Sequence, residues 1–350
     1  MSAMAGDTVR YACLGCGKIA NNYHLPALAR IPEAQFVAAC DIDEDRARET
    51  ADTFDAEEAA TDWELIVERD DIDLVCIFTK IDTHAEMAVE AANAGRHVFI
   101  QKPFARTVAE GEAMVEAAQV SGTRMIPSFM HRYFDESLMA AALVREGAVG
   151  DVELIRQRNA TRNPRETAPS YGGAMMDIGA HGIDLVRAIS GSEITRVCAR
   201  LDEPDVLPDL PRDERDLRGG EVNAFMLYEL DSGATVSHEV QWSQAAGASR
   251  FECEVYGTHG TIMLRSPRSD ADLALHSTPD ADNPLKEPVE WRTPALPGRE
   301  MGAAQHEAVI DALLGRGHDA QSGADGLAVL RVCEAARQSA LSGCWEDVLR

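Results

Sequence analysis

A glycine-rich turn directly after an apolar run constrains this chain more than any other feature. Residues 9–15 (VRYACLG) are predicted to form a buried strand, and GCGKIA at 15–20 follows with the pattern G-x-G-x-x-(G/A). In this pattern the first glycine permits a tight turn, the second lets the backbone approach a pyrophosphate, and a small third residue lets helix and strand pack closely. The sequence therefore predicts a dinucleotide-binding loop made of Gly15, Cys16, Gly17, Lys18 and Ile19.

An acidic residue ends the second predicted strand. Residues 35–41 (QFVAACD) form an apolar run that closes on Asp41, 26 residues after Gly15. A carboxylate at this place accepts hydrogen bonds from the adenosine ribose and repels a 2′-phosphate. No Arg or Lys follows until Arg46, so the sequence favours NAD as the cofactor and leaves NADP as the alternative.

The first third of the chain alternates between strand and helix patterns. Apolar runs predict further strands at 73–79, 97–101 and 123–129, and amphipathic stretches predict helices at 83–95 and 107–121. Strands that alternate with helices form a parallel sheet covered on both faces. We therefore predict an α/β fold that begins with an NAD-binding Rossmann domain, a doubly wound parallel sheet, over residues 7–127.

The pattern changes near residue 128. Strands are now predicted at 152–160, 194–201, 221–230, 234–243, 251–256 and 260–265, and helices at 135–147, 174–190, 303–315 and 324–341. Two stretches rich in Pro and Asp, 202–220 and 266–300, predict surface loops. Residues 128–350 are thus predicted to form an α+β domain with an open, mostly antiparallel sheet.

The charge balance excludes several classes of protein. The chain has 33 basic and 59 acidic residues, a net charge of −26, so neither a nucleic-acid partner nor an anionic membrane is expected. No apolar run reaches about 18 residues, so no transmembrane helix is expected. No basic segment followed by an apolar stretch opens the chain, so no secretory signal is expected. The chain has only four lysines, and such an acidic composition is expected of a halophilic source, with an ordinary acidic cytosolic protein as the alternative.

The eight cysteines lie mostly in apolar runs, where a free thiol behaves as a small hydrophobic side chain. Cys13 and Cys16 form a C-x-x-C pair, but no second pair or nearby His pair completes a zinc site. We expect reduced, structural cysteines, a cytoplasmic location and no metal site.

Two segments carry candidate catalytic groups. Gln101-Lys102-Pro103 ends the predicted strand 97–101, and open α/β sheets bind ligands at the carboxyl ends of their strands. Lys102 is therefore expected to reach a substrate oxygen. Asp177 and His181 are four residues apart and share one face of the predicted helix. A histidine suits taking the proton of an alcohol, and a carboxylate one turn away can orient it, although a purely structural pair is the alternative.

Six landmarks in a fixed order resemble the glucose–fructose oxidoreductase / inositol dehydrogenase (Gfo/Idh/MocA) family of NAD(P)-dependent dehydrogenases. They are GCGKIA, Asp41, Thr83-His84, GRHVFIQKP (95–103), GGAMMDIGAHGIDL (172–185) and SGADGLAVLRVCEAARQSALSG (322–343). The resemblance covers about residues 8–348. It implies that the Rossmann domain is followed by a sheet domain that binds the substrate and forms a homodimer or homotetramer.

The resemblance also implies roles for single residues. Lys102 and His181 would flank the nicotinamide, with His181 as the acid/base and Asp177 orienting it or binding a hydroxyl. The expected cofactor contacts beyond the glycine loop and Asp41 are Thr79, His84, Gln101 and Lys102. The expected substrate contacts are Lys102, Arg132, Arg162, Asp177 and His181, while the alternative for the arginines is pairing with the chain's own acids.

Three residues depart from the family pattern. Gln101 replaces the usual Glu beside Lys102, so the ammonium is held less strongly as a cation. Lys80 stands where a proline is usual, and His131 precedes Arg132 in place of another polar residue. The last two are expected to affect substrate preference.

The sequence thus predicts an enzyme that passes hydride between a secondary alcohol of a sugar, sugar derivative or cyclitol and nicotinamide. One alternative is an enzyme that uses tightly bound NAD to cleave glycosides or to move hydride between two sugars. Another is a non-catalytic, NAD-dependent sensor, although a sensor has no need of both Lys102 and His181.

Overall fold

The computed structural model describes residues 7–202, 220–244, 251–265, 273–277, 291–317 and 320–349. The chain forms two compact units, Met1–Met130 with Arg299–Leu330, and His131–Gly298 with Arg331–Arg350. The division into 7–127 and 128–350 drawn from the sequence differs from this one, because it placed residues 299–330 in the second domain.

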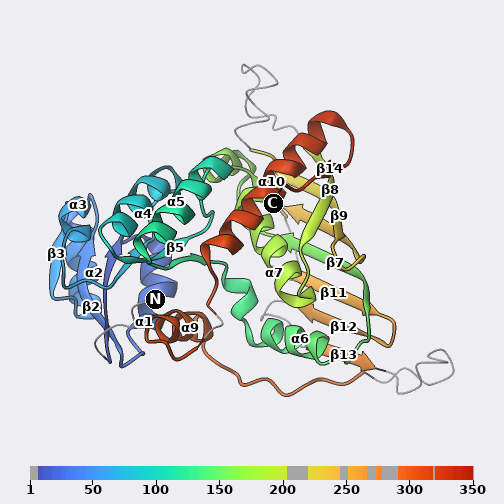
Figure 1. Ribbon diagram of the computed structural model, residues 1–350, viewed down its shortest axis with the longest axis horizontal. Coiled ribbons are helices and arrows are strands. Elements are labelled where there is room, and N and C mark those ends of the chain that lie inside the picture. Colours follow the sequence, from blue (N-terminus) through green and yellow to red (C-terminus); the bar gives the residue numbers. More distant parts are fainter. Residues whose placement is uncertain are drawn as a thin grey trace. The chain divides into compact units, whose positions relative to one another are not determined.

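The first unit is built on a six-stranded sheet in which every pair of neighbours is parallel. The strand order is β3-β2-β1-β4-β5-β6, as in a doubly wound nucleotide-binding fold. Figure 1 labels β3, β2 and β5 of this sheet. The strands are β1 (Val9–Leu14), β2 (Ala34–Cys40), β3 (Glu58–Ala60), β4 (Leu74–Ile77), β5 (His97–Gln101) and β6 (Met125–Ser128). All the predicted strands of this half are present, and the short edge strand β3 adds one that the sequence did not reveal.

The helices of the first unit cover the sheet because its strands are apolar on both faces. They are η1 (Ala20–His24), α1 (Leu25–Leu28), α2 (Glu44–Phe54), α3 (Trp63–Val67), η2 (Ile81–Thr83), α4 (His84–Asn93), α5 (Val108–Ser121) and α9 (Ala303–Leu313). From α9, Val309 and Leu313 join Tyr11 and Phe36 in one buried cluster. This packing explains why residues 299–330 belong with the first unit.

The segment η1 is a π-helical turn and not the regular helix start expected after a glycine loop. Pro26 follows within two residues and lacks the N–H that an α-helix would direct to residue 22. The irregular turn places Tyr23 and His24 in the interior of the unit.

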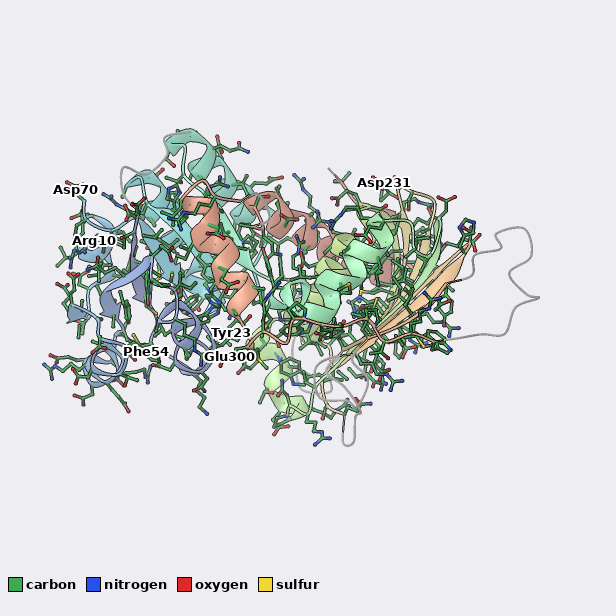
Figure 2. The ribbon with its side chains drawn as sticks, turned by 90° about the horizontal axis from the view of Figure 1, so that it is seen from below. Arg10, Tyr23, Phe54, Asp70, Asp231 and Glu300 are labelled. Atoms are coloured by element: carbon green, nitrogen blue, oxygen red, sulfur yellow. The ribbon has the colours of Figure 1, made fainter. Side chains whose placement is uncertain are left out.

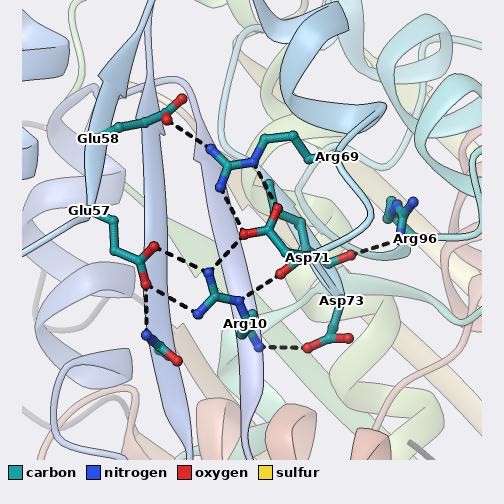
Figure 3. Close-up of polar contacts among 9 residues, drawn as sticks. Arg10, Glu57, Glu58, Arg69, Asp71, Asp73 and Arg96 are labelled. Atoms are coloured by element: carbon teal, nitrogen blue, oxygen red, sulfur yellow. Dashed lines mark hydrogen bonds and ion pairs between the residues drawn. The ribbon is translucent and has the colours of Figure 1, made fainter.

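A network of ion pairs joins the amino ends of the strands, at the edge opposite to the glycine loop (Figure 3). The guanidinium of Arg10 lies 3.1 Å from Glu57 and 2.8 Å from Asp71. Arg69 also binds Asp71 at 2.8 Å, and these hydrogen bonds hold the pKa of the Asp71 carboxyl well below its usual value. Each exposed ion pair contributes at most about 1 kcal/mol to stability. Any larger stabilisation by this network must come from several such pairs together.

The second unit is built on an eight-stranded sheet in the order β13-β12-β11-β7-β10-β9-β8-β14. Among the described strands of this second sheet, β7 and β10 are the one parallel pair of neighbours. The strands are β7 (Val152–Ala160), β8 (Ile194–Leu201), β9 (Asn223–Leu230), β10 (Thr235–Gln241), β11 (Phe251–Gly257), β12 (Gly260–Arg265), β13 (Leu273–Ser277) and β14 (Glu346–Asp347). This confirms the predicted mostly antiparallel sheet.

Helices accompany this sheet. They are η3 (Met130–Tyr133), α6 (Asp135–Arg145), η4 (Arg165–Tyr171), η5 (Met175–Gly179) and α7 (Ala180–Ser190), and α10 (Gly323–Ser342) runs from the first unit into the second. The loop predicted at 266–300 is wrong in part, because it contains β13, and Leu275 bridges to Arg292. Most of the loop predicted at 202–220 lies outside the described residues. Within the described ranges, no helix combines the length and the apolarity needed to cross a membrane.

Candidate active site

The glycine loop lies at the carboxyl end of β1, where its backbone comes close to the chain after β4. Gly15 has a φ of +93°, and a Cβ added there would lie 2.8 Å from the backbone N of Thr79 and 2.9 Å from the carbonyl carbon of Phe78. Only glycine tolerates both this left-handed backbone and this approach. The strand order reverses between β1 and β4, which is where open α/β sheets bind their ligands.

The space beside the next glycine of the loop, Gly17, is empty. A Cβ added at Gly17 would meet no atom within 4 Å, and Lys18 and Ile19 are exposed. Such a bare stretch of backbone at the start of a helical segment fits a pyrophosphate, because the first N–H groups of a helix attract negative charge.

Asp41 follows β2 and is tied to the glycine loop. Its carboxylate accepts hydrogen bonds from the backbone N–H of Cys16 at 2.8 Å and of Asp43 at 3.0 Å. The half-exposed guanidinium of Arg46 lies 3.2 Å from the same carboxylate, because the first turn of α2 brings it back over the strand end. The carboxylate that predicts a preference for NAD therefore has a cation beside it, which the sequence reasoning had discounted.

The Gln101-Lys102-Pro103 turn ends β5, next to β4 in the sheet. The backbone N–H of Lys102 donates to Oε1 of Gln101 at 2.6 Å, and the Lys102–Pro103 peptide is cis. Lys102 is half-buried, whereas the carboxamide of Gln101 is buried and contacts His24. The sequence reasoning missed His24 and its neighbour His306, which lie 282 positions apart and carry no shared motif.

His84, at the start of α4, connects this turn to the end of β4. Its Nδ1 lies 2.9 Å from the carbonyl oxygen of Pro103 and its Nε2 3.3 Å from that of Thr79. Burial lowers the pKa of His84. The hydroxyl of Thr79 accepts a hydrogen bond from Thr83 at 2.8 Å. The structure therefore brings together one set of predicted residues along a single sheet edge, namely Gly15, Cys16, Gly17, Lys18, Ile19, Asp41, Thr79, His84, Gln101 and Lys102.

The acid–histidine segment belongs to the second unit. The regular helix predicted over 174–190 is wrong at its start, because η5 is a π-helical turn that carries Asp177, and α7 begins just before His181. Both side chains are buried. The ring of His181 stacks on that of His131, with centroids 4.1 Å apart and an angle of 18° between the planes. π-Helical turns within helices occur frequently at functional sites.

The arginines predicted to meet the substrate have partners within the protein. Arg132 donates from Nε to the fully buried Asp184 at 2.8 Å, and its second nitrogen also contacts that carboxylate. Arg162 is exposed, in the short bridge to Ser243. Contacts of Arg132 and Arg162 with a substrate stay predictions. In the part of the chain that the structure describes, no cluster of three or more His, Cys, Asp or Glu residues is placed to hold a metal ion.

A parallel sheet with a glycine loop at its switch point and an acid after the second strand defines a dinucleotide-binding enzyme domain. Comparisons agree with this. Residues 9–129 match the oxidoreductase family with an NAD-binding Rossmann fold, GFO/IDH/MocA, and residues 138–263 match the GFO/IDH/MocA C-terminal domain. The chain belongs to the GFO/IDH/MocA family of oxidoreductases.

Individual relatives span both units. Inositol 2-dehydrogenase 3 of Saccharopolyspora erythraea is 32% identical over 265 residues, 74% of each chain. Levoglucosan dehydrogenase of Pseudarthrobacter phenanthrenivorans is 28% identical over 342 residues, 86% of each chain. A structure of levoglucosan dehydrogenase in complex with NADH has a TM-score of 0.84 and 25% identity, and it covers 98% of this chain and all of that one. The protein is therefore an NAD-dependent oxidoreductase, and its glycine loop fits that cofactor.

Proposed function

We propose that the protein oxidises, reversibly, a secondary alcohol of a sugar, sugar derivative or cyclitol. The observation that carries the proposal is the Lys102 turn, which ends β5 at the same sheet edge as the NAD-binding glycine loop. The relatives that act on inositol and levoglucosan support the substrate class. Bound NAD supplies the nicotinamide ring that takes the hydride.

The residues of the first unit hold the cofactor in two ways. The open backbone of the glycine loop binds the pyrophosphate, and Asp41 accepts hydrogen bonds from the ribose. His84 and Gln101 engage protein atoms with their polar groups, so we assign them to holding the Lys102 turn in place. Thr79 borders the glycine loop directly.

Lys102 and His181 have different tasks in the removal of the proton from the substrate hydroxyl. The ammonium of Lys102 donates a hydrogen bond to the substrate oxygen and stabilises the negative charge that grows on it as its proton leaves. His181 takes that proton, and Asp177 orients His181 or binds a neighbouring hydroxyl. The stacked ring of His131 restricts rotation of His181.

Arg132 and Arg162 remain our candidates for further substrate contacts. The guanidinium of Arg132 pairs with the buried Asp184. Arg162 is exposed, and we assign it to binding a substrate carboxylate. A Kd for uronates that rises in Arg162→Ala while the Kd for neutral polyols stays unchanged would support this division.

The test is NADH formation, in high salt, over a panel of aldoses, cyclitols, glycosides and uronates. We expect turnover of one class, abolished in Lys102→Met and His181→Asn, with Lys102→Arg retaining only a small part because a guanidinium is not a compact ammonium. Turnover that survives both substitutions would contradict the assigned roles. Purified protein that carries non-exchanging NAD and forms no net NADH would favour the tightly bound cofactor enzymes. Exchangeable NAD without any turnover would favour the sensor.

We also propose a homodimer or homotetramer formed through the second unit's sheet. Phe225 and Leu227 of β9 are 45% exposed, and they alternate with the buried residues Ala224, Met226 and Tyr228. The middle of the outward side of this strand is therefore apolar, between Asn223 and Glu229. In a chain of net charge −26, association should weaken at low salt, so elution volumes in size-exclusion chromatography that do not change with salt would count against it.

A cytoplasmic location is part of the same proposal. All eight cysteines are free thiols, which suits a reducing compartment.

A further inference from the structure

A buried chain of four hydrogen bonds runs from the carbonyl of Gly302 to the backbone of Lys102. His306 Nδ1 lies 2.7 Å from the Gly302 oxygen, and its Nε2 lies 2.9 Å from Nδ1 of His24. His24 Nε2 lies 3.0 Å from the Gln101 amide nitrogen, and Gln101 Oε1 accepts from the Lys102 N–H at 2.6 Å. We call this chain the histidine relay.

The two ends of the histidine relay fix the direction of every link. A backbone carbonyl can only accept and a backbone N–H can only donate. Four links need four protons, of which the Lys102 N–H and the Gln101 amide supply one each. His24 and His306 must therefore supply one each, and both rings are neutral with the proton on Nδ1.

The surroundings of the two rings favour this neutral state. The ring of Phe78 stacks on His24 with centroids 3.9 Å apart, and Tyr23 meets the edges of both imidazoles. Tyr23 is the titratable side chain among these neighbours, and its hydroxyl donates to Gln305 at 3.0 Å. Burial lowers the pKa of His306 to about 4 and lowers that of His24 as well.

The histidine relay connects two distant parts of the first unit. His24 comes from the π-helical turn after the glycine loop, and His306 comes from the first turn of α9. Tyr23 lies beside the segment before α9, 3.2 Å from the place that a Cβ would take at Gly302 (Figure 2). The start of α9 is thus linked to the end of β5 through His24 and Gln101.

We propose that Gln101 is a positioning residue, which keeps the histidine relay uncharged and thereby holds the backbone of Lys102 in one place over the pH range of turnover. The inference rests on the proposed contact of Lys102 with the substrate oxygen. The carbonyl oxygen of the next residue, Pro103, lies within hydrogen-bond distance of His84 Nδ1. The backbone of the turn is therefore fixed by hydrogen bonds at both Lys102 and Pro103.

The identity of residue 101 decides the charge of the relay. A glutamate there would have the same shape but no amide proton, so the four links would be one proton short. The missing proton would be restored on His24, which would become an imidazolium beside the new carboxylate. Gln101→Glu therefore converts an uncharged relay into one that binds a proton.

The first measurement needs no activity. In full-length protein labelled with 15N at histidine and at lysine, the wild-type rings of His24 and His306 should carry the proton on Nδ1 and leave Nε2 bare across neutral pH. Gln101→Glu should add a proton to His24, and the backbone amide resonance of Lys102 should then titrate with the ring. A wild-type ring that carries its proton on Nε2, or is charged at neutral pH, would overturn the relay whether or not the protein is a sugar dehydrogenase.

The second measurement is the pH profile of kcat and KM. Gln101→Glu should show an ionisation limb that the wild type lacks, mainly in kcat. Gln101→Met should lose about tenfold in kcat at every pH, the effect of about one hydrogen bond. The matched control is Gln321→Glu, the same change at a buried glutamine that accepts from the backbone N–H of Phe129 at 3.2 Å, and its profile should run parallel to the wild type.

The positioning role would be overturned if the pH profile of Gln101→Glu ran parallel to that of the wild type, or if kcat were unchanged in Gln101→Met. This holds even if both wild-type histidine rings carry their proton on Nδ1. If the wild type turns over no sugar at all, the proposed function fails, and the 15N spectra still decide the relay.

Discussion

Substituting the first glycine of the loop tests how closely the ends of β1 and β4 approach each other. Gly15→Ala would hold a Cβ at a φ of +93°, which costs about 1–2 kcal/mol. The methyl would also lie 2.8 Å from the backbone N of Thr79, and relieving such an overlap costs about 1–3 kcal/mol. The free energy of unfolding should therefore fall by about 2–5 kcal/mol without any cofactor present.

Gly17→Ala is the matched control, since the same methyl would meet nothing within 4 Å. The apo protein should be as stable as the wild type, or more stable by about 0.4–1 kcal/mol through the unfolded state. Its NAD affinity should nevertheless fall about tenfold or more, because the methyl stands where the pyrophosphate must approach the backbone.

Urea unfolding of the apo proteins and calorimetric NAD titration of the folded ones separate the two effects. A stable Gly15→Ala protein would refute the close approach of the two strand ends. A Gly17→Ala protein that binds NAD like the wild type would show that the pyrophosphate does not cross the loop at this residue.

Three further substitutions test other parts of the account. Asp41→Ala should lower NAD affinity about tenfold, through the lost hydrogen bonds to the ribose, and raise NADP affinity, because Arg46 loses one of its two carboxylate partners. Fluorescence titration with both cofactors checks this, and an unchanged preference contradicts it. Gly182→Ala would place a methyl against Oδ1 of the buried Asn159 and should lower the free energy of unfolding in urea by about 1–3 kcal/mol, whereas equal stability would mean that α7 can move off the sheet. Because two arginines lower the folded-state pKa of Asp71, its ionisation stabilises the protein above the unfolded pKa of about 3.9, and this stability is lost as the pH falls through the folded pKa. Asp71→Asn should therefore flatten the fall in urea midpoint between about pH 5 and about pH 3, and an unchanged slope would contradict the network.

Most of the fold follows from the sequence because hydrophobic periodicity is a local signal. The strands around 9–15, 73–79 and 97–101 are short apolar runs that end in glycine or polar residues, and they form β1, β4 and β5. The second sheet is similarly visible in its alternating strands. Short edge strands such as β3 and β14 are missed because two or three residues carry no period.

The non-local features could not be predicted from one sequence. The helix α9 joins the first unit because Val309 and Leu313 complete its core, which depends on tertiary packing and not on a motif. The pairing of Arg132 with Asp184 joins positions 52 apart, so a predicted substrate contact proved also to be an internal ion pair.

The candidate site divides in the same way. The glycine loop and Asp41 have a fixed spacing and could be assigned residue by residue. His24 and His306 lie 282 positions apart in the sequence, and no local sequence pattern predicts their contact. The two π-helical turns were missed because their residues have the composition of ordinary helices.

The most direct test of the central claim uses a sugar or cyclitol substrate carrying deuterium on the carbinol carbon. Mass spectrometry of the released cofactor should find the deuterium in NADH, and turnover should slow relative to the protium substrate. Substrate consumed without any deuterium in NADH would contradict net hydride transfer to NAD, and with it the proposed dehydrogenase function.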